Sequence, residues 1–275
     1  IYYDNHGGPG ILGTPNGYEI EADKVSESFE SASKSQLYKQ CLFMIEACYS
    51  GSVAEVITAS NLAIITAANN AESSYAAVYD EELGTYLSNE FTNYFISLID
   101  ENPTITVGEL FTTLQKETEE SHVCFYGDET IQKVPISTFI GTPNKKVKTN
   151  KINKKEMKLV KQKEATEKTL KFMSNHEKAS VRSRARLHML KLKAQTEKLE
   201  AVLDLIVKYV DPKNYEKIMN DKQTKLTKTY FEVLKVFRER IGEINPDDYG
   251  RFNVLKALTA SHSKEEIIQG IFAVL

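Results

Sequence analysis

Residues 42–52 read LFMIEACYSGS, and this stretch decides the fold class. Its first four residues are apolar and predict a buried strand. The strand runs on through the carboxylate of Glu46 to the thiol of Cys48, and small turn-forming residues follow. A carboxylate in an apolar strand is costly unless a partner is present. The stretch therefore predicts a buried strand that carries a thiol to the edge of a sheet.

A second run of the same design lies at residues 1–10, IYYDNHGGPG. Here an apolar start leads to His6, and glycines follow it. Neighbouring parallel strands end at the same edge of a sheet, where open α/β folds bind their ligands. We therefore expect His6 to take the proton of Cys48, so that the thiolate can attack a carbonyl group. The backbone N–H groups of Gly7 and Cys48 are the candidate oxyanion donors.

The first half of the chain alternates between two kinds of segment. Short apolar runs predict strands, and longer amphipathic runs predict helices. This alternation predicts an α/β fold with a mostly parallel sheet flanked by helices. The predicted strands are residues 1–3, 10–12, 42–45 and 62–66, and the predicted helices are residues 23–39, 52–59 and 85–99.

The composition changes at Pro143. Residues 145–163 contain nine lysines and few apolar side chains, which is typical of an exposed linker. No aromatic side chain that could stack on a base lies in this run, so we do not expect nucleic-acid binding. Beyond it, an apolar stripe over residues 199–210 and three capping sequences (Asp211-Pro212, Asn245-Pro246 and Ser263 to Glu266) predict a helical bundle. The expected organisation is an α/β domain over 1–143, a linker over 144–167 and an all-α region over 168–275.

Charge is distributed unevenly along the chain. The 275 residues carry a net charge of −3, but residues 1–143 hold 21 acidic and 5 basic side chains, and the remainder holds 17 acidic and 30 basic ones. Opposite charges favour docking of the two halves on each other. The alternative is two independently solvated surfaces.

Several classes of site are not expected. The three cysteines form no CxxC pair and lack metal-ligand spacing with the histidines, so neither a metal site nor a disulfide framework is predicted. No organic cofactor is expected either. No apolar stretch approaches the roughly 20 residues that span a bilayer, so no membrane insertion is predicted.

Further motifs, in an ordered set over about 130 residues, make the chain resemble the legumains (asparaginyl endopeptidases), a family of caspase-like cysteine proteases. The matching residues are His6-Gly7, Gly10-Ile11-Leu12, Glu46-Ala47-Cys48 with Ser50-Gly51-Ser52, Thr66-Ala67-Ala68-Asn69, Glu72-Ser73-Ser74-Tyr75-Ala76, Tyr79-Asp80-Glu81, Thr85-Tyr86-Leu87, Ser121-His122-Val123 and Tyr126-Gly127.

The resemblance implies a caspase-like cysteine endopeptidase that cleaves proteins and peptides after asparagine, and after aspartate in acid. It makes Cys48 the nucleophile and His6 the base. Glu46 would form the floor of the specificity pocket, because a carboxylate accepts from a side-chain amide, and Ser73 would flank it.

The chain departs from the family pattern at the pocket. The usual pocket aspartate falls at Asn89, which removes one negative charge unless Glu90 turns inward instead. Asn5 also stands where an aspartate usually precedes the histidine. His122 belongs to the matching set, but we expect it to be structural.

The resemblance also implies a zymogen. Legumains carry a helical C-terminal prodomain that covers the active site until acid activation, so the helical half is expected to be an intramolecular inhibitor. Asn144, Asn150 and Asn153 are candidate self-cleavage sites. The family's first strands are expected to lie before Ile1, which leaves the sheet incomplete at its N-terminal side. The family points to a lysosomal, vacuolar or secreted location.

Three alternatives stay open. The same acyl-enzyme could be intercepted by an amine, which would make the protein a peptide ligase. A related transamidase attaches lipid anchors, but residues 46–52 follow the protease pattern. The third alternative is a caspase-like interaction module without catalytic activity.

Overall fold

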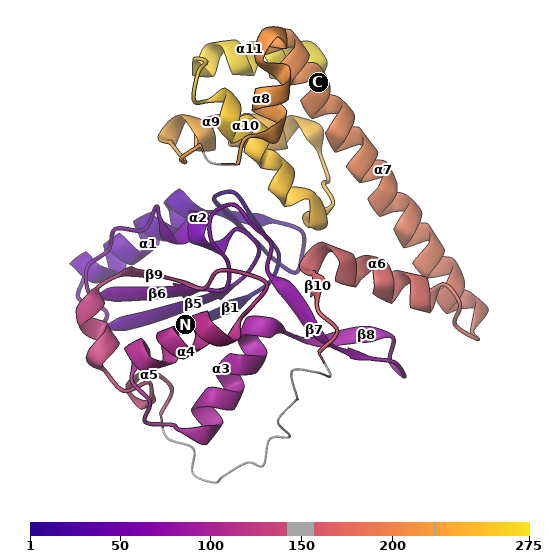
Figure 1. Ribbon diagram of the computed structural model, residues 1–275. Helices are drawn as coiled ribbons and strands as arrows, with labels where there is room; N and C mark the ends of the chain where they lie inside the picture. Colours follow the sequence, from indigo (N-terminus) through magenta and orange to yellow (C-terminus); the bar gives the residue numbers. More distant parts are fainter. Residues whose placement is uncertain (142–156, 223) are drawn as a thin grey trace.

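The computed structural model describes residues 1–141, 157–222 and 224–275 (Figure 1). Its central sheet has the strand order β1-β5-β6-β9. The first three strands are parallel, and β9 pairs antiparallel with β6 at the edge. These strands are β1 (Tyr2–Asp4), β5 (Cys41–Glu46), β6 (Leu62–Thr66) and β9 (Cys124–Gly127). The predicted α/β class with a mostly parallel sheet is confirmed.

Helices cover both faces of this sheet, as Figure 1 shows. Alternate residues of β5 explain why, since Phe43 and Ile45 belong to one apolar core and Leu42 and Met44 to the other. The first core includes α2, and the second is closed by α3 and α4. The helices of this half are α1 (Ala22–Lys34), α2 (Ser50–Ala54), α3 (Glu90–Glu101), α4 (Val107–Glu117), α5 (Ser137–Ile140) and the 3₁₀ helix η1 (Glu129–Lys133).

Two small antiparallel sheets flank the central one. In the first, β2 (Gly7–Gly8), β3 (Ile11–Gly13) and β4 (Glu19–Glu21) pair in order. The second joins β10 (Val160–Lys161), β7 (Tyr75–Asp80) and β8 (Thr85–Asn89).

The helix predicted over residues 85–99 is wrong in its first part. Residues 85–89 form β8, and the helix begins only at Glu90. Tyr86 faces Tyr79 across β7 and β8, with ring centroids 5.0 Å apart. This cross-strand aromatic pair stabilises a strand where periodicity alone favoured a helix.

Beyond α5, the described residues form helices joined by loops, together with the short strand β10. The capping predictions at Asp211, Asn245 and Ser263 are confirmed, because each side chain accepts a backbone N–H at the start of its helix. The elements are α6 (Gln162–Met173), α7 (Ala179–Val210), η3 (Pro212–Asn214), α8 (Tyr215–Asn220), α9 (Lys228–Ile241), η4 (Pro246–Phe252), α10 (Asn253–Leu258) and α11 (Lys264–Val274).

Part of the predicted linker is ordered. Residues 160–167, which composition assigns to the linker, form β10 and the start of α6. Val160 pairs with Ala76 of β7, and Thr169 of α6 bonds to Thr85 of β8 at 3.0 Å. Backbone pairing on an existing strand edge therefore holds this segment in place, with Val160 buried and the side chains of Lys161 and Lys163 exposed.

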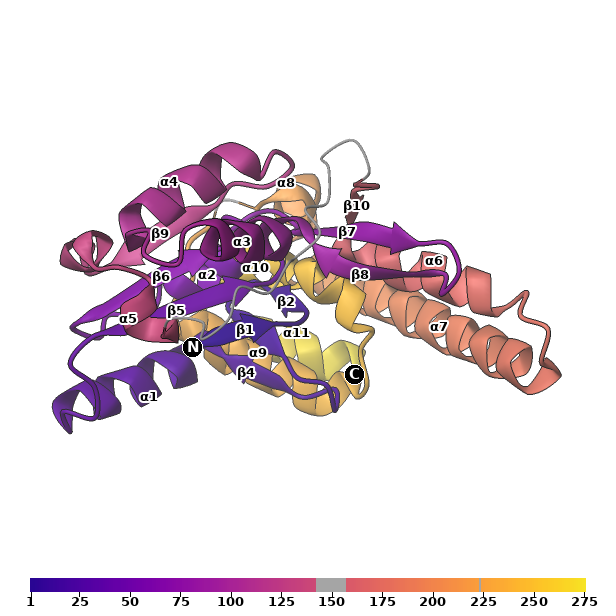
Figure 2. The same cartoon turned by 90° about the horizontal axis from the view of Figure 1, so that it is seen from below.

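The helices α6 and α7 form a hairpin that projects from the body beside β7 and β8 (Figures 1 and 2). The longer of the two, α7, has 32 residues, and its N-terminal half buries little besides Ala185. Within the described ranges, no helix is both long and apolar enough to cross a membrane.

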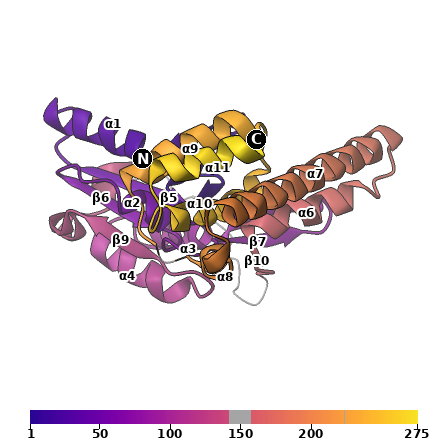
Figure 3. The same cartoon turned by 90° about the horizontal axis from the view of Figure 1, so that it is seen from above.

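The helical region and the α/β half share one apolar core. Ile11 and Ile45 belong to the same buried cluster as Phe231, Phe237 and Tyr249. From above, α9, α10 and α11 lie over this part of the molecule (Figure 3). Apolar contact over both halves is the main term that holds them together.

Polar contacts fix the relative position of the two halves. Tyr230 Oη donates to the carbonyl oxygen of Pro9 at 2.6 Å, in a buried position. Arg238 pairs with Glu19 and Glu21 of β4. Gly8 lies so close to Tyr249 that a Cβ on it would meet the Tyr249 backbone oxygen at 2.9 Å.

We predict that Tyr230→Phe lowers the free energy of unfolding by about 1–2 kcal/mol, because the buried carbonyl of Pro9 loses its donor. Urea denaturation monitored by circular dichroism measures the change. Tyr18→Phe is the control, since Tyr18 is 69% exposed and should leave stability unchanged. Equal midpoints for both variants would contradict the prediction.

Candidate active site

The ends of β1 and β5 lie side by side. The two strands pair in parallel, with Asp4 opposite Glu46, and the N–H of Asn5 donates to the carbonyl of Glu46 at 3.3 Å. The chain therefore leaves both strands at the same edge. His6 and Cys48 follow within two residues, and both line one cleft of about 640 Å³ between the sheet edge and the helical region.

The thiol of Cys48 is buried and has one close partner. Its Sγ lies 3.0 Å from Ser73 Oγ and 3.9 Å from Ser74 Oγ. Burial raises the pKa of the Cys48 thiol, so it is protonated at rest. A base is needed to generate the thiolate.

A sharp turn follows the thiol. Tyr49 has φ of +58°, a left-handed conformation that non-glycine residues rarely adopt. Its N–H donates to the carbonyl of Glu72 at 2.8 Å, and α2 begins at the next residue. This turn stops β5 and holds Cys48 at the cleft.

His6 is held through its backbone. Its N–H donates to Asn5 Oδ1 at 2.7 Å, and its carbonyl accepts from Gly13 N at 2.8 Å and from Tyr3 Oη at 3.1 Å. Burial lowers the pKa of the imidazole, which favours the neutral form that can accept a proton. A neutral histidine that lines the same cleft as a buried thiol is a candidate general base.

An acidic residue from the helical region faces this imidazole. Asp247 Oδ1 of η4 lies 3.5 Å from His6 Nδ1. Burial, together with Asp248, raises the pKa of Asp247 to about 7. Sequence reasoning missed this contact, because Asn245-Pro246 was interpreted only as a helix start. No local pattern links residue 247 to residue 6.

The predicted oxyanion donor Gly7 sits in a very tight space. A Cβ on Gly7 would meet the carbonyl oxygen of Cys48 at 2.3 Å and the Cβ of Ala47 at 2.9 Å. Only glycine lets the two loops approach this closely. The role of its N–H group stays a prediction.

Glu46 is buried, is not among the residues that line the cleft, and is only half satisfied. One carboxylate oxygen accepts from Thr92 N at 3.2 Å and from Thr92 Oγ1 at 3.0 Å. The other oxygen, Oε1, is buried and has no partner at hydrogen-bond geometry within the described part of the chain, although the Ser74 hydroxyl is close enough to stabilise the carboxylate and lower its pKa. Burial, with a contribution from Asp4, raises the pKa of Glu46 to about 8. A ligand that offers an N–H group would satisfy the free oxygen.

The remaining pocket candidates take distinct places. Asn89 is buried and donates to Asp4 Oδ1 at 3.0 Å, next to Glu46 in the sheet. Glu90 accepts from the backbone N–H groups of Glu119 and Glu120 at 3.0 and 3.4 Å. The alternative in which Glu90 replaces a pocket aspartate is therefore wrong, because both oxygens of its carboxylate bind backbone N–H groups of residues 119 and 120.

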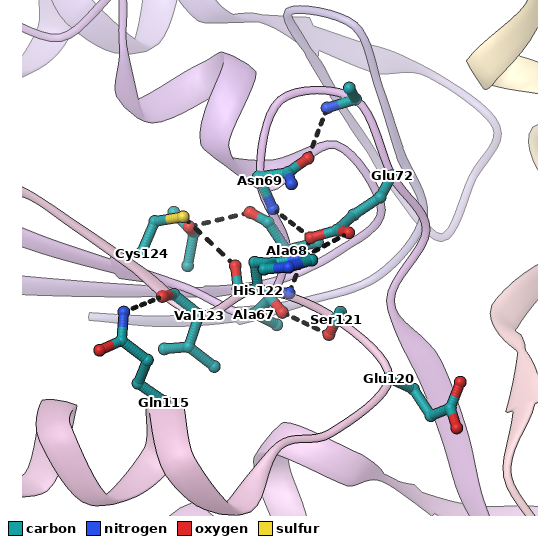
Figure 4. Close-up of polar contacts among 12 residues, drawn as sticks. Ala67, Ala68, Asn69, Glu72, Gln115, Glu120, Ser121, His122, Val123 and Cys124 are labelled. Atoms are coloured by element: carbon teal, nitrogen blue, oxygen red, sulfur yellow. Dashed lines mark hydrogen bonds and ion pairs between the residues drawn. The ribbon is translucent and has the colours of Figure 1, made fainter.

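His122 belongs to a separate cluster around Glu72, drawn in Figure 4. Its Nδ1 lies 2.9 Å from Glu72 Oε2, and its backbone N–H donates to Glu72 Oε1 at 2.7 Å. The N–H of Asn69 donates to the same Oε1 at 3.0 Å. Glu72 thus ties the segment after β6 to the start of β9, and this segment carries Ser73 into the cleft. Glu72 belongs to one of the matching motifs, but no role was predicted for it from the sequence.

The three candidate self-cleavage residues, Asn144, Asn150 and Asn153, lie outside the described residues. Of the other candidates, His6, Gly7, Cys48 and Ser73 line the cleft, and Glu46 is buried beside the Asp4–Asn89 pair.

Comparison with known proteins gives one family. The model of the peptidase C13 family matches residues 1–142. Legumain of Homo sapiens is 33% identical over 148 residues, which are 53% of this chain and 34% of that protein. The vacuolar-processing enzyme delta-isozyme of Arabidopsis thaliana is 33% identical over 157 residues, 51% of this chain and 34% of its own length. The GPI-anchor transamidase of Saccharomyces cerevisiae is 29% identical over 126 residues, 45% of this chain and 31% of its own length. The chain spans about a third of the length of these relatives.

We predict that Glu46→Gln removes part of the pH dependence of stability. With a folded-state pKa of about 8 against an ordinary 4.5, the folded wild type keeps a proton that the unfolded chain loses, so its stability falls as the pH rises between these values. The glutamine variant escapes this cost. As the pH rises from 5 to 8, the free energy of unfolding of the variant should therefore increase relative to that of the wild type by a few kcal/mol, to order of magnitude.

Urea titrations at both pH values measure this difference. Glu82→Gln, at an exposed glutamate, serves as the control. Parallel stability curves for Glu46→Gln and wild type would contradict the assignment.

Proposed function

The chain belongs to the peptidase C13 family, and from this premise we propose that it is a cysteine endopeptidase that cleaves after asparagine. One observation carries the proposal: His6 and Cys48 line the same cleft at the ends of two adjacent parallel strands. The relatives named legumain and vacuolar-processing enzyme support the same class of reaction.

The proposed reaction begins with proton transfer from Cys48 Sγ to the imidazole of His6. The thiolate attacks the carbonyl carbon of the scissile bond, and the N–H groups of Gly7 and Cys48 stabilise the oxyanion. The imidazolium then donates its proton to the leaving amine, which leaves an acyl-enzyme. Water activated by His6 hydrolyses the thioester and restores the thiol.

The free oxygen of Glu46 supports asparagine specificity. A side-chain amide supplies the N–H that Oε1 lacks, and a hydroxyl such as that of Ser73 can serve either end of the amide. In acid, a protonated aspartate offers an O–H donor in the same place. Asn89, bound to Asp4, leaves this pocket with one carboxylate fewer than an aspartate would supply.

The helical region supports the proposal of a zymogen. Asp247 faces His6, and a Cβ on Gly250 would meet Tyr49 Oη at 2.5 Å, so η4 packs directly over the site. We propose that the helical region inhibits the site until it is released. Self-cleavage at Asn144, Asn150 or Asn153 in an acidic vacuole-like or lysosome-like compartment would complete activation.

Docking of the helical region responds to acid in two opposite senses. Burial raises the pKa values of Glu19, Glu21 and Asp247, so protonation of these interface carboxylates favours the docked state. The solvated carboxylates of residues 1–143 act the other way, because their protonation removes the negative charge that attracts the basic half. In the proposed activation, acid releases the helical region through protonation of these solvated carboxylates.

We predict that acid-treated protein cleaves an asparagine-containing peptide and that Cys48→Ala lowers the rate by at least about 10³-fold. Mass spectrometry of the products measures cleavage and its position. Cys124→Ser is the matched control, because that thiol bonds to the His122 carbonyl, away from Cys48.

Three other outcomes have distinct meanings. Cleavage with equal efficiency after glutamine would contradict the specificity. Dominant transfer to an added amine would favour the ligase. Absence of cleavage, with Cys48 inert to an alkylating probe, would favour the non-catalytic module.

We predict that Arg238→Met loosens the helical region at neutral pH. Glu19, whose side chain is 7% exposed, would lose its ion-pair partner, and an uncompensated buried charge costs on the order of 3 kcal/mol. Alkylation of Cys48 by iodoacetamide, followed by peptide mapping, should accelerate about tenfold or more. Arg240→Met is the control, because Arg240 lies over the Phe272 ring within the helical region. An unchanged alkylation rate would argue against docking through Arg238.

A further inference from the structure

The chain bends sharply directly after Cys48, and the bend does not hold itself. Tyr49 has a left-handed backbone, which is strained for a residue other than glycine and persists only where the surroundings impose it. The helix that follows, α2, has five residues, and the Tyr49 side chain caps no N–H group in the described part of the chain. A helix this short is not stable alone. The bend therefore depends on contacts from elsewhere.

Residues 67–73 supply these contacts, and we call them the thiol brace. The N–H of Gly51 donates to the carbonyl of Ala68 at 3.0 Å, and the N–H of Tyr49 donates to the carbonyl of Glu72 at 2.8 Å. The packing is close, since a Cβ on Gly51 would meet the backbone of the brace at 2.8 Å. The brace thus holds the strained residue and the start of the helix that follows it.

The last residue of the brace reaches the thiol. Ser73 Oγ lies 3.0 Å from Cys48 Sγ, and both residues line the cleft. Burial raises the pKa of the Cys48 thiol, and the Ser73 hydroxyl acts against this by stabilising the thiolate. Such a hydrogen bond weakens steeply when its distance or angle changes. The ease with which the thiolate forms therefore depends on where the brace places Ser73.

One carboxylate sets the shape of the brace. Glu72 Oε1 accepts from the N–H of Asn69 at 3.0 Å and from the N–H of His122 at 2.7 Å, and Glu72 Oε2 lies 2.9 Å from His122 Nδ1 (Figure 4). Asn69 lies within the brace, and His122 lies two residues before β9 of the central sheet. The carboxylate therefore closes the brace on itself and anchors it to the sheet.

Polar contacts, and not apolar packing, hold most of the brace. Among the described residues, the two apolar cores contain none between positions 69 and 75. The side chains of Glu72 and His122 are themselves 24% and 79% exposed. Loss of the carboxylate should therefore loosen the brace locally while most of the fold keeps its stability.

We propose that Glu72 is a positioning residue for the nucleophile: its backbone carbonyl holds the bend after Cys48, and its carboxylate keeps the Ser73 hydroxyl against the thiol. His122 anchors that carboxylate. The proposal rests on the proposed role of Cys48 as the nucleophile, and it is independent of the specificity for asparagine.

Steady-state cleavage of an asparagine-containing peptide, per molecule of processed protein, tests this role. We expect Glu72→Ala to lower kcat by at least about tenfold and to change KM by less than about threefold, because the thiol and not the bound peptide loses its partner. Glu72→Gln should recover most of the loss, since its amide oxygen still accepts both N–H groups. Glu82→Ala, at an exposed glutamate, is the matched control. An unchanged kcat in Glu72→Ala would overturn the proposal.

A pH titration of the thiol tests the role without any cleavage. In the whole chain labelled with ¹³C at the cysteine Cβ atoms, the Cys48 resonance, identified by its loss in Cys48→Ala, reports ionisation of the thiol. We expect a higher pKa of the thiol in Glu72→Ala and in Ser73→Ala than in wild type. The double variant Glu72→Ala/Ser73→Ala should show no further rise, because both changes remove the same contact. Equal pKa values in Glu72→Ala and wild type, or rises that add, would overturn the proposal.

His122→Ala carries the test if Glu72→Ala does not fold, because this imidazole is exposed and only Glu72 Oε2 loses a partner. We expect a smaller rise of the thiol pKa in the same direction and a kcat about threefold lower. Unchanged values of both would overturn the proposal. If the wild type cleaves no peptide while the titrations behave as expected, the proposed function fails and the positioning of the thiol by Glu72 stands.

Discussion

The parallel pairing of β1 with β5 is the constraint on which the cleft depends. Its register sets Asp4 opposite Glu46, and His6, Gly7 and Cys48 follow within three residues of that pair. A shift by one residue would turn each side chain of β1 to the other face of the sheet. Because both faces of β5 are packed against apolar cores, such a shift is opposed on both sides. The packing of the α/β core therefore fixes the geometry of the site.

Two kinds of contact hold the helical region at this sheet edge, and they differ in their response to salt and pH. The shared core that joins Ile11 and Ile45 to Phe231 and Tyr249 supplies apolar burial, which salt and pH affect little. Ion pairs such as that of Arg238 supply the electrostatic part, which both conditions change. Release by acid alone therefore has to overcome an apolar contact. This explains why cleavage of the linker, and not charge alone, is a natural second step in the proposed activation.

Patterns local in sequence predicted much of this molecule. The strand that leads to Cys48 and the cap at Ser263 depend on neighbouring residues, and both follow from the local pattern. Features that depend on contacts between distant segments could not be predicted from local patterns. Residues 85–89 form a strand because Tyr79 lies opposite Tyr86, and Val160 is ordered because β7 has a free edge. The contact of Asp247 with His6 joins the two ends of the chain, and no periodicity encodes it.

The closeness of Gly8 to Tyr249 has an evolutionary consequence. In the α/β half alone, nothing requires a glycine there through a left-handed backbone, because its φ is not positive. The requirement comes from the opposite end of the polypeptide, whose backbone fills the space that a methyl group would need. A side chain at this position is therefore opposed only in the form that carries the docked helical region. Under the proposed activation, a substitution at Gly8 would hinder docking of the helical region but would leave the α/β half free of that clash once the helical region has been released.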